Sequence, residues 1–225
     1  MSEQQNPEQI QDSSNYDATP RLTEHRKEWM ERVLANRTRH FTMVLEDLFD
    51  PHNISAVIRT SEVYGLQDIH IIEEINPYRI NKSILKGSFK WLNIYLYKSR
   101  QKCFETLKAK GYRIAVASTN TNTPITSLDL SIPTAFYLGT EFKGNHPDTL
   151  AQADVDFILP QYGVTESMNV SVAGGVLMTY MDFWMQKVGR STVAVQGAEL
   201  DLLRQEWYNR QAYGTELHSP IQRIS

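Results

Sequence analysis

The sequence has a single cysteine, Cys103, and no long apolar run. One cysteine excludes an intrachain disulfide and every zinc or iron–sulfur site that needs several cysteines, and it is typical of proteins kept in a reducing compartment. A membrane-spanning helix needs about 20 consecutive apolar residues, and the first 20 residues lack the basic and apolar regions of a signal peptide. We therefore expect a cytoplasmic protein without a membrane segment, and no metal is expected.

The motifs of several common sites are also missing. Neither G-x-G-x-x-G nor G-x-x-x-x-G-K-[ST] occurs, which disfavours a Rossmann dinucleotide site and a Walker-type phosphate site. There is no G-x-S-x-G nucleophile motif and no H-E-x-x-H zinc motif, and the six histidines stand singly. Each histidine is therefore interpreted as a surface residue or a hydrogen-bonded core residue.

Positive charge is concentrated in two blocks, although the net charge is -3. Residues 21–40 carry six Lys or Arg against three Asp or Glu, and residues 79–113 carry ten against one. By contrast, residues 41–78 contain one Lys or Arg, which is Arg59, against seven Asp or Glu. The two blocks fit either a surface that binds a polyanion or a solvated lysine-rich helix, and charge alone does not choose between them.

Short apolar runs alternate with helical patterns along most of the chain. Buried strands are predicted in six runs, at 41–48, 68–73, 91–97, 112–118, 134–139 and 155–160. Helices are predicted over 22–36, 53–64, 100–110, 148–152, 170–187 and 198–211. This order predicts one α/β domain at 41–188 with a mainly parallel sheet. Outside it we expect a disordered acidic tail at 1–20, a basic N-terminal helix at 21–40, and a helical extension at 189–225 that ends in a loose tail.

Three polar, glycine-containing loops follow the last three predicted strands, at 115–122, 137–145 and 158–175. Ligands bind at the carboxyl ends of parallel strands, so these loops are predicted to form one pocket. In the third loop, Ser167 and Asn169 precede a helix and could simply cap it. Gly174 and Gly175 cost about 1 kcal/mol each in a helix relative to alanine, which indicates close approach of another backbone, within the chain or at a subunit interface.

With these segments in order, the chain resembles the SPOUT-class RNA 2′-O-ribose methyltransferases of the SpoU branch, and more closely the TrmH-type tRNA (guanosine-2′-O-)-methyltransferases. The resemblance rests on VLEDLFDPHNISAVIRTSEVYG at 44–65, FYLGTEFKG at 136–144 and ILPQYGVTESMNVSVAGG at 158–175. It extends to LTEHRKEWMERVL at 22–34 and GSFKW at 87–91. It implies an α/β fold with a deep C-terminal trefoil knot, S-adenosyl-L-methionine as cofactor, and a homodimer packed partly through the last core helix.

The resemblance also assigns site residues by their place in the motifs. Cofactor contacts are implied for six residues: Ser118, Leu138, Gly139, Gly144, Leu159 and Met168. Roles in structure and chemistry around the ribose are implied for five: Asn53, Arg59, Glu141, Ser167 and Asn169. Family proposals have an arginine accept the 2′-OH proton, but arginine is a poor base, so the alternative is that Arg59 clamps a phosphate while another group takes the proton. Asn53 is expected to cap the helix that carries Arg59.

The substrate implied by the resemblance is tRNA, with guanosine 18 of the D-loop as the favoured target. RNA binding is expected for five cations of the basic blocks: Arg26, Lys27, Arg32, Lys86 and Lys90. Together with Arg21, Arg37 and Arg39, the N-terminal cations could extend the grip beyond the pocket, and Lys82, Lys86 and Lys90 are expected to lie nearer the pocket. The alternatives are a 2′-O-methyltransferase of ribosomal RNA and a non-catalytic knotted RNA-binding factor. The presence of Arg59, Glu141 and Asn169 argues against the last.

Overall fold

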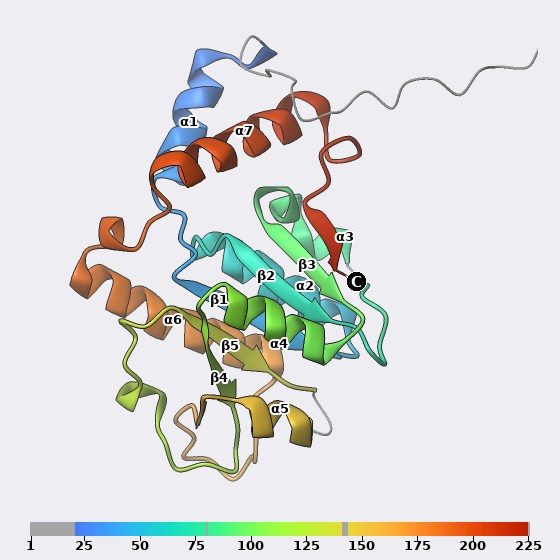
Figure 1. Cartoon of the computed structure of the whole chain (residues 1–225), viewed down its shortest axis with the longest axis vertical. Coiled ribbons are helices and arrows are strands. Elements are labelled where there is room, and N and C mark those ends of the chain that lie inside the picture. The colour runs from blue at the N-terminus through green and yellow to red at the C-terminus, as the bar shows by residue number, and fades with distance from the viewer. Residues whose placement is uncertain (1–20, 80, 141–143, 225) are drawn as a thin grey trace, which may run out of the picture.

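The computed structural model describes residues 21–79, 81–140 and 144–224. Its centre is a seven-stranded parallel sheet in the order β6-β4-β5-β1-β2-β3-β7 (Figure 1). The strands are β1 (Phe41–Glu46), β2 (Asp68–Ile72), β3 (Asn93–Tyr97), β4 (Arg113–Ala117), β5 (Thr134–Leu138), β6 (Val155–Phe157) and β7 (Ile221–Ile224). The predicted parallel sheet is confirmed, and its first six strands lie within the six predicted runs.

Helices precede, connect and follow the strands. They are α1 (Glu24–Leu34), α2 (Pro51–Val63), α3 (Lys82–Leu85), α4 (Arg100–Ala109), α5 (Pro147–Gln152), α6 (Val170–Val188) and α7 (Gly197–Tyr213). A 3-10 turn, η3 (Ser88–Trp91), leads into β3. Among the residues that the structure describes, no helix has both the length and the apolar composition needed to cross a bilayer.

Strand β1 illustrates how helices cover both faces of the sheet. Met43 and Leu45 belong to an apolar cluster with residues of α2 and α6, whereas Val44 belongs to a second cluster with Phe104 of α4. Side chains alternate between the two faces of a strand, so a strand covered on both faces is buried along its length and mostly apolar. This composition explains why the strands could be recognised as apolar runs.

The C-terminal segment corrects one prediction. Residues 221–224 are not a loose tail, because they form β7, which pairs with β3 at the edge of the sheet. Helix α7 is anchored just before β3: the buried Arg210 donates from Nη1 to the Leu92 carbonyl at 3.0 Å and from Nη2 to Asn93 Oδ1 at 2.8 Å. A four-residue edge strand has too short an apolar pattern to be recognised in the sequence.

The expected N-terminal helix is α1, and it packs against α7. Met30 and Leu34 of α1 lie in one apolar cluster with Trp207 of α7. Glu31 of α1 accepts hydrogen bonds from Arg204 Nε at 2.7 Å and from the Tyr208 hydroxyl at 2.9 Å. The acidic tail expected at 1–20 lies outside the described residues.

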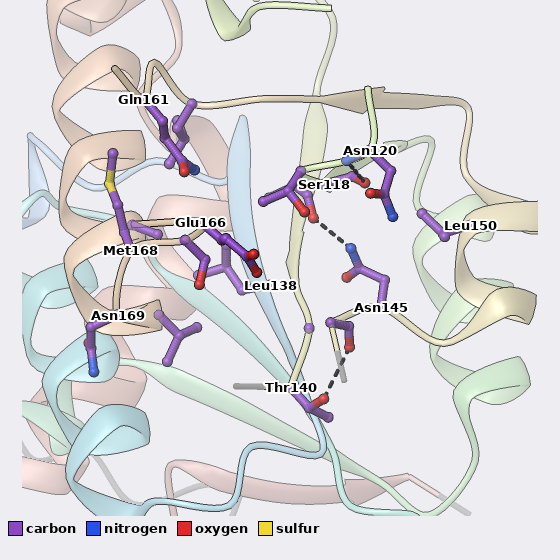
Figure 2. Close-up of a pocket in the computed structure, with 18 residues that line it drawn as sticks. Ser118, Asn120, Leu138, Thr140, Asn145, Leu150, Gln161, Glu166, Met168 and Asn169 are labelled. Carbon is purple, nitrogen blue, oxygen red and sulfur yellow. Dashed lines mark hydrogen bonds between the residues drawn. The ribbon is translucent and has the colours of Figure 1, made fainter. Parts of the chain in front are cut away.

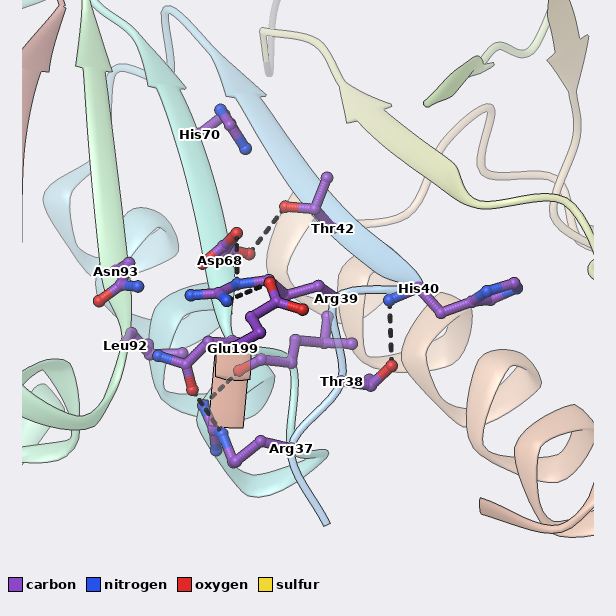
Figure 3. Close-up of polar contacts among 12 residues, drawn as sticks. Arg37, Thr38, Arg39, His40, Thr42, Asp68, His70, Leu92, Asn93 and Glu199 are labelled. Atoms are coloured by element: carbon purple, nitrogen blue, oxygen red, sulfur yellow. Dashed lines mark hydrogen bonds and ion pairs between the residues drawn. The ribbon is translucent and has the colours of Figure 1, made fainter. Parts of the chain in front are cut away.

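Two arginines of the N-terminal block are held by the protein itself and do not form a free RNA-binding surface (Figure 3). Arg37 is fully buried and donates to Gln67 Oε1 at 2.9 Å and to the Glu62 carbonyl at 3.0 Å. Burial lowers the pKa of Arg37 to about 10. Arg39 forms ion pairs with Asp68 and with Glu199 of α7. The expectation that Arg37 contacts RNA is therefore wrong, and the charge of Arg39 is already paired.

Candidate functional site

A cavity of about 500 Å³ opens at the carboxyl ends of β4 and β5, where the three predicted loops meet (Figure 2). Cavities of this volume are typical of small-molecule sites. Eight of the eleven predicted cofactor and ribose residues line it, namely Ser118, Leu138, Gly139, Gly144, Leu159, Ser167, Met168 and Asn169. The structure thus brings the three loops together, while the role of each residue remains a prediction.

The second loop is closed by two main-chain hydrogen bonds. Thr140 N donates to the Gly144 carbonyl at 3.0 Å, and Gly144 N donates to the Thr140 carbonyl at 3.1 Å. A Cβ atom on Gly139 would lie 2.5 Å from Asn145 Oδ1 and 2.7 Å from the Gly144 carbonyl oxygen. A glycine is therefore needed at position 139 because residues 144 and 145 of the same loop pack against it, whether or not a ligand also approaches it.

The third loop ends at Asn169, which caps α6 as predicted. Its Oδ1 accepts from Ser171 N at 2.9 Å and from Val172 N at 3.4 Å. Its Nδ2 donates to Asn53 Oδ1 of α2 at 3.1 Å. The side chain of Asn169 therefore fixes the start of α6 and also ties it to α2.

The expectation that Asn53 caps α2 is wrong. Asp50 is the cap, since it accepts from His52 N at 2.8 Å, and Pro51 occupies the first helical position. Aspartate followed by proline is a strong start signal for a helix. Aspartate caps the free N–H groups of the first turn, and proline lacks an N–H group that would have no intrahelical acceptor at this position. Asn53 lies one turn further on, is buried, and meets Asn169 instead.

Arg59 lies on the same helix but outside the cavity. Its side chain is exposed, and Nη1 donates to the Ile84 carbonyl at 3.3 Å. It is absent from the described residues that line the cavity, so a single chain does not bring this guanidinium beside the cofactor residues. Glu141, the other charged residue predicted for the ribose site, lies outside the described residues.

Among the polar residues of the cavity wall that were not predicted from the sequence, Asn145 and Glu166 have the most distinctive side chains. Asn145 donates from Nδ2 to the Ala117 carbonyl at 2.6 Å, which leaves its buried Oδ1 without a hydrogen bond in the described chain. Glu166 is the only charged side chain among the described residues that line the cavity. Both lie inside the predicted loops at 137–145 and 158–175, but nothing in the sequence shows that their side chains face a cavity.

The paired glycines of α6 have different surroundings. A Cβ on Gly174 would lie 3.4 Å from side-chain atoms of both Leu138 and Val57. Tight packing within the chain therefore explains why a glycine stands at this position. A Cβ on Gly175 would meet no atom within 4 Å. Close approach within the chain therefore accounts for Gly174 and not for Gly175.

A second concentration of functional candidates lies at the opposite, amino end of the sheet. It includes Lys90 of η3, so the expectation that Lys90 lies near the cavity is wrong. Arg26 of α1 donates to Gln211 Oε1 of α7 at 2.9 Å, and Lys90 of η3 donates to the same oxygen at 3.2 Å. Arg26 stacks over Trp29, and Lys90 lies over Trp91, with 4.4 and 4.5 Å to the ring centroids. Burial and the nearby Arg26 lower the pKa of Lys90. We name Arg26, Lys90 and Gln211 the Arg26–Lys90 cluster.

The other predicted RNA-binding cations differ in how free they are. Lys27 forms an ion pair with Glu24 at 2.8 Å. Arg32 and Lys86 are exposed. The side chain of Lys82 lies outside what the structure describes. The two cations of the Arg26–Lys90 cluster are thus the ones that the fold brings together.

A parallel α/β sheet whose carboxyl-end loops enclose a small-molecule cavity is the architecture of α/β proteins that bind a cofactor or nucleotide at that edge. Comparison with family models identifies the family within this class. The chain belongs to the SpoU rRNA Methylase family, whose model matches residues 40–179. The family membership expected from the sequence motifs is confirmed.

Similar proteins agree with this membership. A protein of Borreliella burgdorferi named tRNA (guanosine(18)-2′-O)-methyltransferase is 34% identical over 192 residues, which cover 84% of this chain and 87% of the relative. The Escherichia coli K12 protein of the same name is 31% identical over 147 residues, covering 65% of this chain and 64% of the relative. The crystal structure of the A. aeolicus TrmH/SpoU tRNA modifying enzyme superposes with a TM-score of 0.76 at 24% identity, covering 84% of this chain and 97% of that one.

Proposed function

We propose that the protein transfers a methyl group from S-adenosyl-L-methionine to the ribose 2′-OH of guanosine 18 in tRNA. The observation that carries the proposal is family membership together with relatives of that name that match most of the chain. The cavity lies where the family motifs meet, which supports a small-molecule donor at this site.

The cavity suits S-adenosyl-L-methionine in size and chemistry. Leu138, Leu159 and Met168 offer apolar surface, and the unpartnered Asn145 Oδ1 offers a hydrogen-bond acceptor for a donor group of the ligand. A SpoU methyltransferase from Streptomyces viridochromogenes, AviRb, has been solved in complex with AdoMet, at a TM-score of 0.61 and 16% identity. When bound, the cofactor supplies a transferable methyl group on a sulfonium.

The protein's own task is to place the ribose hydroxyl in line with that methyl group and to assist loss of its proton. Ser167 and Asn169 stand at the cavity wall and can orient the ribose, while Asn53 keeps Asn169 in place. Arg59 acts on the RNA phosphate, since a guanidinium binds phosphate through a planar fork and is a poor base. Glu141 belongs to the same proposed ribose site.

The functional unit in this proposal is a homodimer packed partly through α6. Val172 and Phe183 of α6 are 54% and 65% exposed, and Gly175 has open space above it. A second copy that covers these residues would bury apolar surface. The trefoil knot also belongs to the proposal: Ile158 pairs with Thr123 and Ile125 of the β4–β5 connection before the chain returns as α6, which is compatible with threading through that connection.

The proposed organisation of the chain is an acidic tail at 1–20, a basic N-terminal helix at 21–40, a methyltransferase domain at 41–188 and a C-terminal extension at 189–225. With tRNA as the substrate, we propose that the protein acts in the cytoplasm. A second candidate function is 2′-O-methylation of ribosomal RNA, which the printed description of the matching family names. A non-catalytic RNA-binding factor has no such observation in its favour.

Nucleoside analysis tests the proposed function. Purified protein is incubated with labelled S-adenosyl-L-methionine and either a tRNA transcript, the same transcript with guanosine 18 replaced, or ribosomal RNA. We expect 2′-O-methylguanosine only in the intact tRNA. Label in ribosomal RNA alone would favour the second candidate, and no label in any RNA would contradict both.

Loss of the Arg26–Lys90 cluster is expected to weaken tRNA binding and its salt dependence. Arg26→Gln combined with Lys90→Gln removes two cations that have no acidic partner among their described contacts. Each phosphate contact contributes about 0.7 to 0.9 to the slope of log K against log salt, so the slope should fall by roughly one to two. The measurement is tRNA affinity between low and moderate salt by filter binding.

The matched control is Lys102→Gln with Lys110→Gln, which removes two cations that have no acidic partner among their described contacts. Both belong to α4 or its C-terminal cap, and α4 lies apart from α1 and α7 (Figure 1). The control should keep the slope of the unchanged protein. Equal slopes for both double variants would refute an RNA contact at the cluster and leave it as a link between α1, η3 and α7.

A further inference from the structure

Glu166 has a singular electrostatic position in the cavity. It is the one charged side chain among the described residues that line it, and it has no hydrogen bond or ion pair within the described chain. Figure 2 shows Glu166 and Asn145 on opposite sides of the cavity, each directed inward. The wall thus presents a carboxylate and an unpartnered amide oxygen, both of them acceptors.

A cavity with a negative, acceptor-rich wall favours a ligand that is positively charged. Resting on the proposed function, we infer that Glu166 is the counter-charge for the sulfonium of the methyl donor and thereby a specificity-determining residue. It distinguishes the donor from the demethylated product, S-adenosylhomocysteine, whose sulfur is a neutral thioether.

This assignment has a consequence for turnover. During transfer the sulfur–methyl bond breaks, its electron pair stays on sulfur, the methyl group bonds to the ribose oxygen, and the hydroxyl proton passes to a basic group or to water. The sulfur therefore loses its positive charge, and the attraction to Glu166 disappears. A carboxylate at this position retains the donor and does not retain the product.

Binding measurements without RNA test the inference. Isothermal titration with S-adenosyl-L-methionine and with S-adenosylhomocysteine compares the unchanged protein with Glu166→Gln, which keeps the shape and removes the charge. We expect donor affinity to fall about two- to fivefold and product affinity to stay unchanged, because Glu166 is exposed and a charge pair at an exposed site is screened by water. Added salt should likewise reduce the donor preference of the unchanged protein.

Control variants separate the possible failures. Glu105→Gln removes an exposed acid from α4 and should change neither affinity, and Glu166→Asp should keep part of the donor preference. If Glu166→Gln loses both ligands equally, or loses neither, the sulfonium assignment is overturned while the proposed function stands. If the unchanged protein binds neither ligand, the proposed function itself fails.

Discussion

Replacing Arg59 by alanine is expected to lower the methyl-transfer rate by at least about 100-fold, a loss typical of removing one catalytic group. Arg59 is the only Lys or Arg in residues 41–78. Its guanidinium is exposed and donates to one main-chain acceptor at 3.3 Å. Because it packs against so little, its removal should leave the melting temperature nearly unchanged. Single-turnover methylation of tRNA and a thermal melt of the same preparation measure the two quantities.

Arg59→Lys separates the two proposed roles of this residue. Lysine keeps the positive charge but lacks the planar fork that binds two phosphate oxygens at once. We expect activity well below that of the unchanged protein. Near-normal activity in Arg59→Lys would contradict any requirement for the fork or for an arginine base.

Arg113→Ala is the matched control for the Arg59 variants. Arg113 also donates to a main-chain oxygen, that of Asp129 at 2.8 Å, but it lies at the amino end of β4, away from the cavity. It should retain full activity. A comparable loss of activity in Arg113→Ala would show that the effect at Arg59 is nonspecific.

The sheet could be predicted from the sequence because its strands are buried on both faces. Such strands are mostly apolar, and they stand out between helical patterns: all six residues of β1 are buried and four of them are apolar. Strand β7 lacks this signature, since two of its four residues are exposed at the edge of the sheet. Its place depends on α7 being anchored through Arg210, a tertiary contact that no local pattern encodes.

The site was predictable where function coincides with a local rule. Asn169 precedes a helix, and a capping residue is recognisable from that position alone. Asn53 was assigned the wrong role because the competing cap, Asp50 before a proline, lies three residues upstream. The inward direction of Asn145 and Glu166 arises only when three loops, distant in sequence, close around one cavity.

Replacing Gly139 by alanine is expected to reduce donor binding by at least about tenfold and to destabilise the fold by about 1 to 3 kcal/mol, the usual cost of overpacking. The added Cβ would lie 2.5 Å from Asn145 Oδ1 and 2.7 Å from the Gly144 carbonyl oxygen. Of these two, the carbonyl belongs to the main chain and is held by the hydrogen bond from Thr140 N. The second loop must therefore open, and the cavity wall formed by Gly144 and Asn145 moves with it.

Gly163→Ala is the matched control in the third loop, because a Cβ at Gly163 would come no closer than 3.9 Å to Thr165 N. It should bind the donor as the unchanged protein does. Titration calorimetry with S-adenosyl-L-methionine and chemical denaturation measure affinity and stability for both variants. If Gly139→Ala binds the donor normally, the closed second loop is not a wall of the donor site. If the variant loses binding but keeps its stability, Gly139 is needed for contact with the ligand and not for the closure of its own loop. We expect weaker binding together with lower stability, because the Cβ added at Gly139 displaces the Gly144 carbonyl, and this one displacement affects both the cavity wall and the loop.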